Sequence, residues 1–201
     1  MRSLLKGFAN ALATAVVMPR VMTFHVARLA IGRDRALEGA TQALSRVPGI
    51  RGQYLRRAFL PAAGVACDPS AAICFGTILS KTGSIIEEGV YVGPRCHLGL
   101  VHLERDVLLG AGVHVPSGGR THGTGDANTP IRDQEGTTTC VRIGAGTWIG
   151  SAAVVLANVG RNCVIGAGSV VTSPIPDDVV AAGAPARIIR RRGEAASVVT
   201  T

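Results

Sequence analysis

One histidine stands in a setting where a side chain can do acid–base chemistry. Residues 116–140 are polar and rich in Gly and Thr, and His122 is the only histidine among them. Imidazole titrates near neutral pH, so a histidine on an accessible loop can remove a proton from a hydroxyl group. Asp126, Asp133, Glu135 or a main-chain carbonyl could orient that imidazole, and their spacing does not decide between them. The alternative interpretation is a solvated loop histidine.

The remaining histidines and the cysteines give weaker signals. His97 and His102 are separated by four residues, and His114 alternates with aliphatic neighbours, which predicts an outward position on a strand. The five cysteines include no CxxC pair, so neither a zinc ribbon nor a thioredoxin-type motif is indicated. We expect the cysteines to be reduced structural thiols.

On both sides of residues 116–140, aliphatic residues recur at every sixth position. They form four triplets of Ile, Leu and Val: Ile86, Val92 and Leu98; Leu103, Leu109 and Val115; Ile143, Ile149 and Val155; Val159, Ile165 and Val171. A small or β-branched residue recurs four positions later: Val90, Cys96, Val107, Val113, Thr147, Ala153, Cys163 and Ser169.

A period of six has a direct geometrical meaning. A short strand and a tight corner together take six residues, so three such sides close a triangular coil of about eighteen, and coils stack at the strand spacing of about 4.8 Å. The aliphatic residue points inward, and glycine gives the backbone freedom at the corner. The long polar segment cannot continue this core, so it is expected to project from the prism as a loop.

The composition agrees with a narrow core of small residues. The 201 residues are 47% hydrophobic but only 3% aromatic and 17% charged, with 26 Gly. Low charge and high apolar content exclude a disordered chain, and glycine without a strict every-third pattern excludes collagen.

Residues 1–60 differ from the rest of the chain. They hold ten Lys and Arg against two acids, a net charge of +8, whereas residues 61–201 hold eleven of each. Apolar residues at three- and four-residue steps predict helices, with Pro19 ending or bending the first and Asp34 capping the second. The segment is either a helical cap packed on the body or an amphipathic arm lying on an anionic membrane surface.

Two partner classes are disfavoured by the same patterns. The uncharged apolar stretch near the N-terminus, residues 7–19, is shorter than the roughly 20 residues that a membrane-crossing helix needs. The body carries no stripe of Arg with interleaved aromatics, which argues against nucleic acid.

Three motifs resemble one family. The repeats, with Thr147-Trp-Ile-Gly-Ser-Ala-Ala-Val154, Val164-Ile-Gly-Ala-Gly-Ser-Val-Val-Thr172 and Ala182-Gly-Ala-Pro-Ala-Arg-Ile-Ile-Arg190, look like the left-handed β-helix acyltransferases, also called hexapeptide acetyltransferases. The resemblance covers roughly residues 73–192. It implies an all-β fold, a left-handed parallel β-helix, in a homotrimer with sites between subunits.

The resemblance also implies an activity and a set of site residues. The chain is expected to transfer an acetyl group from acetyl-CoA to a hydroxyl, with His122 as the general base and no metal. Cofactor contacts carry over to Trp148, Ser151, Ala167, Thr172, Arg187 and Arg190. Where the family often has Lys after the Thr, this chain has Ser173, which removes one possible phosphate contact.

The acceptor is less defined. Residues 45–59 with 75–80 resemble acetyltransferases of bacterial surface polysaccharides, which favours a hydroxyl of a sugar or polysaccharide precursor. Antibiotic acetyltransferases of the streptogramin or chloramphenicol type are an alternative. Serine acetyltransferase ranks lower, because Arg120-Thr-His-Gly123 replaces its typical Asp-Arg-His-Pro. A carbonic anhydrase of the gamma class, using His97, His102 and His25 on zinc, or a non-catalytic β-helix subunit, remains a further alternative.

The predicted organisation is therefore an N-terminal helical arm at residues 1–60, a left-handed β-helix acyltransferase domain at residues 61–192 with loop 116–140 inserted, and a C-terminal tail at residues 193–201 that is expected to be disordered. Use of acetyl-CoA predicts a cytoplasmic location, with peripheral contact at the inner face of the membrane if the arm binds lipid.

Overall fold

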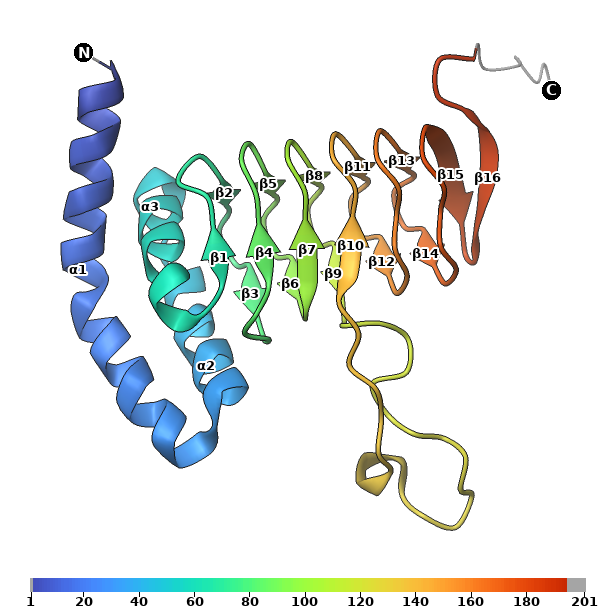
Figure 1. The fold of residues 1–201 in the computed structure, drawn as a ribbon, viewed down its shortest axis with the longest axis horizontal. Helices are drawn as coiled ribbons and strands as arrows, with labels where there is room; N and C mark the ends of the chain where they lie inside the picture. The colour runs from blue at the N-terminus through green and yellow to red at the C-terminus, as the bar shows by residue number, and fades with distance from the viewer. Residues whose placement is uncertain (1, 195–201) are drawn as a thin grey trace.

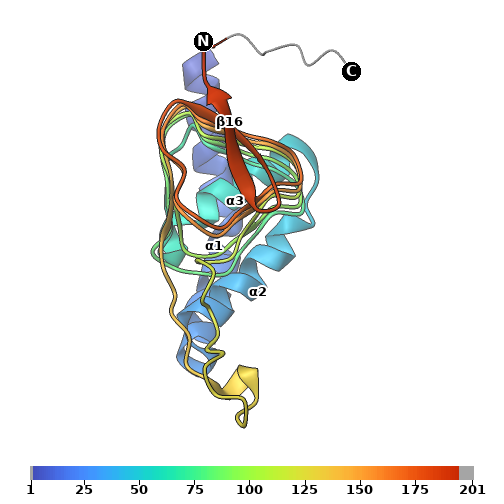
Figure 2. The ribbon, with the colours of Figure 1, turned by 90° about the vertical axis from the view of Figure 1, so that its right-hand side faces the viewer.

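The chain folds into a triangular prism with helices at one end and a long loop at its side. A computed structural model describes the backbone of residues 2–194 and the side chains of residues 7–194. Figure 1 shows the coils stacked from the N-terminal to the C-terminal end, and Figure 2 looks down the stack, where the coils superimpose as a triangle. This confirms the predicted left-handed parallel β-helix with an N-terminal helical region.

Three sheets form the walls of the prism, named here sheets A, B and C. Sheet A contains β1 (Ala66–Cys67), β4 (Ile85–Ile86), β7 (Val101–Leu103) and β10 (Val141–Ile143). Sheet B contains β2 (Ala72–Ile73), β5 (Tyr91–Val92), β8 (Leu108–Leu109), β11 (Trp148–Ile149), β13 (Val164–Ile165), β15 (Val179–Gly183) and β16 (Ala186–Arg191). Sheet C contains β3 (Ile78–Leu79), β6 (His97–Leu98), β9 (His114–Val115), β12 (Val154–Val155) and β14 (Val170–Val171).

The strand register stacks the inward residues directly above one another. Ile149 lies opposite Leu109 on one side and Ile165 on the other, in parallel pairing. Neighbouring strands within the prism pair in parallel, and β16 pairs antiparallel with β15 to close the C-terminal end. The chain enters sheets A, B and C in that order in every coil, which fixes where each corner lies.

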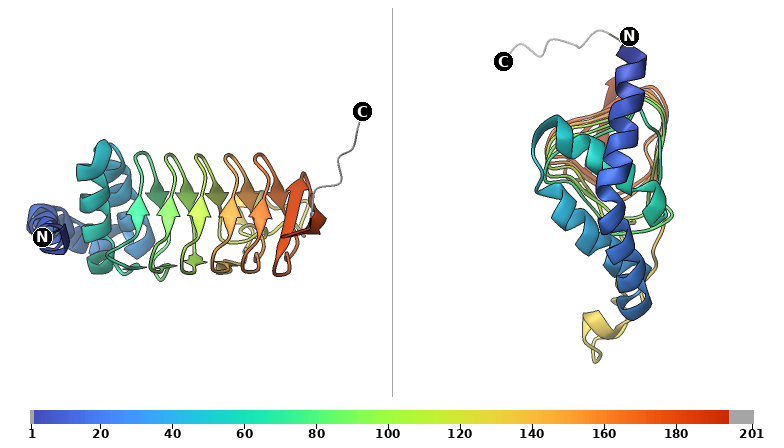
Figure 3. Two further views of the ribbon diagram at one scale, coloured as in Figure 1. Left: turned by 90° about the horizontal axis from the view of Figure 1, so that it is seen from above. Right: turned by 90° about the vertical axis from the view of Figure 1, so that its left-hand side faces the viewer.

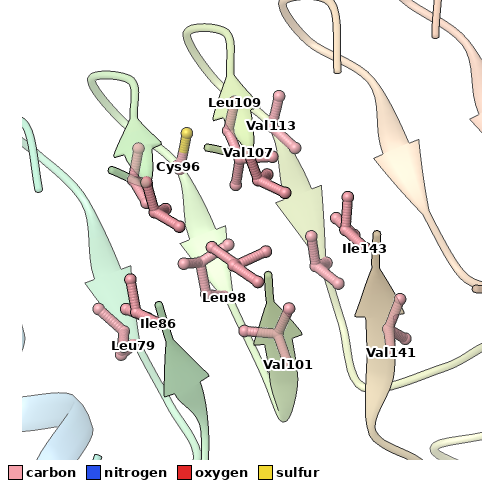
Figure 4. Close-up of a cluster of buried hydrophobic side chains, with 14 of the residues drawn as sticks. Leu79, Ile86, Cys96, Leu98, Val101, Val107, Leu109, Val113, Val141 and Ile143 are labelled. Atoms are coloured by element: carbon pink, nitrogen blue, oxygen red, sulfur yellow. The ribbon is translucent and has the colours of Figure 1, made fainter. Parts of the chain in front are cut away.

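All twelve aliphatic residues of the six-residue repeat are buried, each with 2% exposure or less. Figure 4 shows part of this column of side chains, including Leu98, Leu109 and Ile143. The small positions are buried too, and Cys96 is one of them. Burial raises the pKa of the Cys96 thiol to about 11, so this cysteine packs the core rather than acting as a nucleophile.

Several corners require a left-handed backbone, which few residues with a side chain adopt easily. Between sheets A and B, successive coils place Gly89, Asp106, Gly146, Asn162 and Asp178 there, with φ between 53° and 71°. Glycine has no Cβ to clash in this conformation, and Asn and Asp tolerate it better than most residues. The corner positions are therefore occupied by residue types that tolerate a left-handed backbone.

The arm consists of α1 (Arg2–Ile31), α2 (Arg33–Ser45), α3 (Gly49–Phe59) and the short helix η1 (Pro61–Ala63). Pro19 lies inside α1 and does not end it; Figure 1 shows the helix changing direction about halfway along. Proline removes one helical hydrogen bond and crowds a carbonyl of the preceding turn, which bends a helix. Packing of Val17, Val21 and Phe24 against the rest of the arm keeps both halves in place.

The continuous helix changes one expectation from the sequence. Residues 7–31 are long and apolar enough to cross a membrane by length and composition, with a mean hydropathy of 1.2. Of the 18-residue apolar stretch on which this rests, 17% is buried within the fold. The expectation that no segment reaches this length was wrong, because it ended the stretch at the proline and the first arginine.

Asp34 does not cap α2 as predicted. Gly32 occupies the N-cap position and makes no side-chain cap, while the Asp34 carboxylate accepts hydrogen bonds from the Thr82 N–H at 3.0 Å and the Thr82 hydroxyl at 2.9 Å. The Lys81 ammonium lies 3.0 Å from the same carboxylate. Asp34 therefore ties the arm to the first coil.

A buried arginine joins the arm to the prism. The Arg56 side chain, 3% exposed, donates from Nε to the Ile73 carbonyl and from Nη1 to the carbonyls of Leu44 and Val47, each at 2.9 Å. It connects α3 to the end of α2 and to β2. Phe59 and Leu60 beside it are buried and cover the first coil.

The predicted tail lies almost wholly outside the described residues. Arg190 and Arg191 end β16, and residues 193 and 194 follow it. Residues 195–201 are not described.

Candidate active site

Loop 116–140 leaves the prism where sheet C meets sheet A, and its two limbs are held together. It follows β9 and precedes β10, with the short helix η2 (Ile131–Asp133) along its course. The Thr139 N–H donates to the Ser117 carbonyl at 2.9 Å, and the Thr137 N–H donates to the Arg120 carbonyl at 2.7 Å. Figure 1 shows the loop projecting away from the coils. The expected extruded loop is therefore present, with a paired stalk.

His122 lies just beyond this stalk and is exposed. The peptide before it packs closely on Gly136: a Cβ at Gly136 would lie 2.2 Å from the Thr121 carbonyl oxygen and 2.5 Å from the His122 nitrogen. Gly123 makes a similar approach, because a Cβ there would lie 2.6 Å from the Glu135 carbonyl oxygen. Two glycines thus set the backbone that carries the histidine.

Asp126 accepts hydrogen bonds from other residues of the loop. Its carboxylate accepts from the Asn128 N–H at 2.8 Å and from the Thr129 hydroxyl at 2.6 Å. These bonds, the hydroxyl first, lower the pKa of Asp126 below its ordinary value. Asp133 lies 3.6 Å from Arg132. Among the described residues, no carboxylate pairs with His122, so the orienting partner is not found within the loop of a single chain.

A cleft of about 510 Å³ lies between the stalk and the prism wall. Its lining comes from the stalk residues Gly119, Arg120, Thr137 and Thr139 and from Leu156 and Thr172, which lie at the same corner of successive coils. The structure thus brings the predicted cofactor residue Thr172 to the base of the loop that carries His122. Arg120 and Leu156 were missed from the sequence; the one signal for this corner is that Leu156 follows Val155 as Thr172 follows Val171, each at the end of a triplet.

The other predicted cofactor residues lie elsewhere on the prism. Ser151 and Ala167 occupy the corner between sheets B and C on successive coils, where the Gly168 N–H donates to the Ser151 carbonyl at 2.8 Å. Trp148 stands on the outer face of sheet B and is half exposed. Arg187 and Arg190 lie in β16 at the C-terminal end. A single chain therefore does not gather all six residues around one cleft.

The C-terminal arginines carry charge that is not neutralised by the fold. The Arg187 guanidinium donates to its neighbour's carbonyl, that of Ala186, at 3.1 Å, and Arg190 donates to the Arg191 and Glu194 carbonyls at 3.1 and 2.8 Å. In the described part of the chain neither side chain forms an ion pair. Both keep N–H groups with which a phosphate could pair.

Two of the remaining histidines lie beside each other, and the other two have different neighbours. His97 stacks edge-on with His114, their ring centroids 6.0 Å apart, and His114 points outward as predicted. His102 lies 2.6 Å from the Glu87 carboxylate, and this hydrogen bond lowers the pKa of Glu87. His25 packs against Phe24 in α1. Within residues 7–194, no three His, Cys, Asp or Glu side chains gather as metal ligands.

Comparison with known proteins matches the repeats. The family described as "Hexapeptide repeat of succinyl-transferase" matches residues 83–116 and 140–173, the coils on either side of the loop. The galactoside O-acetyltransferase of Escherichia coli is 56% identical over 52 residues, 25% of this chain and 26% of that protein. The serine acetyltransferase of Salmonella typhimurium is 34% identical over 128 residues, 62% of this chain and 38% of that protein.

A solved structure shares the fold over a longer stretch. The maltose O-acetyltransferase from Clostridium difficile superimposes with a TM-score of 0.56 at 21% identity, covering 80% of this chain and 89% of that one. The chain spans between 24% and 38% of the length of the first curated relatives that it matches. By its six-residue register, its coil and these relatives, the chain has a hexapeptide-repeat β-helix similar to that of the hexapeptide acetyltransferases.

Proposed function

We propose that this chain transfers an acetyl group from acetyl-CoA to a hydroxyl of a sugar or polysaccharide precursor. The observation that carries the proposal is the paired stalk: its residues Gly119 and Arg120, just before His122 in the sequence, line a cleft of about 510 Å³ together with Thr172. The relatives named above are acetyltransferases of a galactoside, of maltose and of serine, which supports the reaction class.

His122 would act as the general base. Its imidazole removes the proton of the acceptor hydroxyl, the resulting oxygen forms a bond to the thioester carbonyl carbon, and the carbon–sulfur bond then breaks. The thiol of CoA leaves with the proton that the imidazole has held. Main-chain N–H groups at the coil edge can stabilise the transient oxyanion.

Acetyl-CoA would lie along the edge of the coils. Small side chains at Ser151 and Ala167 leave the corner open to a linear chain, and Trp148 offers a flat apolar surface nearby. Arg187 and Arg190 would receive the phosphates, because their guanidinium groups are not neutralised by a described acid. Thr172 would contact the part of the molecule closest to His122.

A homotrimer would bring these separate parts together. The outer face of sheet B carries an in-register apolar row, with Tyr91, Leu108 and Trp148 each about half exposed. Sheet A and the corner that follows it instead carry ion pairs: Arg142 with Glu104, and Arg161 with Asp177. A closed ring joins two different patches of each subunit, so an apolar wall and the loop-bearing corner of a neighbour could face each other. We propose that the active site lies at that junction and that the protein works in the cytoplasm.

The experiment is release of free CoA thiol by the purified chain across sugars, nucleotide sugars, serine and streptogramin or chloramphenicol antibiotics. We expect release with a sugar hydroxyl. Release only with serine, or only with an antibiotic, would change the proposed acceptor but would still support acetyl transfer. No release with any acceptor, together with no binding of acetyl-CoA, would favour the non-catalytic subunit, and CO₂ hydration by a zinc-loaded sample would favour the carbonic anhydrase alternative.

A further inference from the structure

Over residues 7–31, where its side chains are described, the solvent-facing side of α1 is unusual because it exposes no charged residue. From residue 7 to residue 31, none of the exposed residues is Asp, Glu, Lys or Arg. The large apolar side chains among them are Phe8, Leu12, Val16, Met18, Met22, Val26, Leu29 and Ile31, with exposures from 48% to 83%. A helix packed on a soluble protein normally turns its polar face to water, so this face is suited to contact with an apolar environment.

The polar groups on this face are already satisfied by the helix. The Thr14 hydroxyl donates to the Asn10 carbonyl at 3.0 Å, and the Thr23 hydroxyl donates to the Arg20 carbonyl at 2.8 Å. Neither needs water. The face can therefore enter an apolar medium without leaving an unpaired hydroxyl donor there.

The uncharged face forms the outermost layer of one end of the molecule. In Figure 3, the view from above places α1 beyond α2 and α3 at the N-terminal end of the prism, and the end-on view shows it in front of the other elements. Between α1 and α3 runs an apolar groove of about 410 Å³, whose lining includes Leu12, Val16, Ile50 and Leu55. Ile50 on α3 is 68% exposed and extends the apolar surface beyond α1.

Positive charge surrounds this surface. Arg33, Arg35 and Arg51 are exposed, and none forms an ion pair with a described residue; Arg51 lies at the groove itself. The first 60 residues carry a net charge of +8. A second copy of the arm would bring the same positive charge against it, whereas an anionic surface would neutralise it.

We propose that α1 docks flat on an anionic lipid bilayer, with its uncharged face among the acyl chains and the surrounding arginines at the headgroups. The opposite side of α1 is packed on the arm through Val17, Val21 and Phe24, so the helix can lie in the interface without leaving the fold but cannot span the bilayer. This proposal is independent of acetyl transfer.

The test is sedimentation of the full chain with vesicles of phosphatidylcholine alone or with about 30% phosphatidylserine. We expect binding to the anionic vesicles, weakened by salt, and about fivefold weaker binding for each arginine removed among Arg33, Arg35 and Arg51. Substituting Leu12→Gln and Val26→Gln together is expected to reduce binding at least tenfold. The matched control, Ile188→Gln with Ile189→Gln, changes two equally exposed residues at the other end of the prism and is expected to bind normally.

Four results would overturn the proposal. The wild-type chain could stay in the supernatant with anionic vesicles, or the Leu12→Gln, Val26→Gln variant could bind as well as the control pair. Light scattering could show that the Leu12→Gln, Val26→Gln variant, with an unchanged melting temperature, loses a dimer or larger assembly that wild type forms. If wild type also failed to bind vesicles, the uncharged face would be assigned to contact with a second copy of the chain. Resistance of bound protein to extraction at alkaline pH would instead indicate a helix that crosses the bilayer.

Discussion

At the scale of single residues, the proposed proton transfer depends on how the backbone positions His122. The histidine is exposed and receives no carboxylate partner from the described chain, so its position is set by the peptide that carries it. That peptide is fixed by the contact of Thr121 and His122 with Gly136 across the stalk. Gly136 therefore acts as a positioning residue for the proposed base.

Replacing Gly136 tests this role. In Gly136→Val, the new side chain must displace the Thr121 carbonyl, which a Cβ would approach to 2.2 Å, so the imidazole moves. We expect kcat/KM to fall at least tenfold, since small misplacements of a catalytic group cost this much or more. Gly125→Val is the control, because nothing lies within 4 Å of a Cβ at Gly125 in the same loop. Equal activity in the two variants would remove Gly136 from the account.

The residue scale also shows where sequence reasoning succeeds. The inward positions of Ile86, Leu109 and Ile165 were predicted because a period of six leaves one direction for each side chain. The hydrogen-bond partners of Asp126 and the close contact of Gly136 were not predicted, because both depend on how the two limbs of the loop pack against each other. The spacing of residues within 116–140 does not indicate that packing.

At the scale of elements, the helices are held to the prism by a few polar contacts. Arg56 supplies three of them to main-chain carbonyls, and Asp34 supplies three more to Lys81 and Thr82. The sequence indicated helices and placed Asp34 at a cap, and it gave no signal that Arg56 is buried. Burial of one and docking of the other arise from tertiary contacts that helical periodicity does not contain.

Arg56→Leu is expected to destabilise the fold strongly. The substitution removes the donor from the carbonyls of Ile73 and Val47 and one of two donors from the carbonyl of Leu44, and each loss of a buried partner costs about 1 to 3 kcal/mol. We expect the free energy of unfolding in denaturant to fall by about 3 kcal/mol or more. Arg46→Leu, at an exposed arginine of the same arm, should stay near wild type. A change below about 1 kcal/mol in Arg56→Leu would show that these bonds contribute little.

Acid should loosen the contact made by Asp34. Partial burial by itself raises the pKa of this carboxyl, but the hydrogen bonds from Thr82 and the ammonium of Lys81 outweigh it and hold the pKa below its ordinary value of 3.8. The contribution of Asp34 to stability is therefore complete above that ordinary value and is lost as the pH falls through the lower, folded-state pKa.

The measurement is the stability difference between wild type and Asp34→Asn as a function of pH. We expect wild type to be more stable near pH 7 and the difference to shrink below about pH 4. Asp133→Asn, at an exposed loop acid, serves as the control. A difference that stays constant from pH 7 to pH 3 would contradict the assigned role of the charge.

At the scale of the whole molecule, the prism spreads the proposed site residues over separate corners. Thr172 lies at the cleft, Ser151 and Ala167 lie across sheet C, and Arg187 and Arg190 lie at the C-terminal end. The resemblance identified these positions one by one, but whether they meet is a property of the assembly. Figure 1 shows the loop leaving the stack of coils near β10, whereas β16 lies at the C-terminal end of the stack.

Acetyl-CoA binding tests whether these positions work together. A ligand present at 100 times its dissociation constant adds about 2.7 kcal/mol of stability, which raises the melting temperature by roughly 5 to 10 °C for a chain of this length. We expect this rise in wild type and in the control Arg132→Gln, and a clearly smaller rise in Arg187→Gln with Arg190→Gln at the same ligand concentration. No rise in wild type would leave the chain without a cofactor site.

The most direct measurement of the central claim is acceptor-dependent release of free CoA thiol by His122→Ala beside wild type. The proposed general base predicts a fall of about 10²- to 10⁴-fold with an unchanged melting temperature. His114→Ala, at an exposed histidine on sheet C, is predicted to keep its activity. Turnover in His122→Ala equal to that of wild type would contradict the claim that this loop histidine drives acetyl transfer.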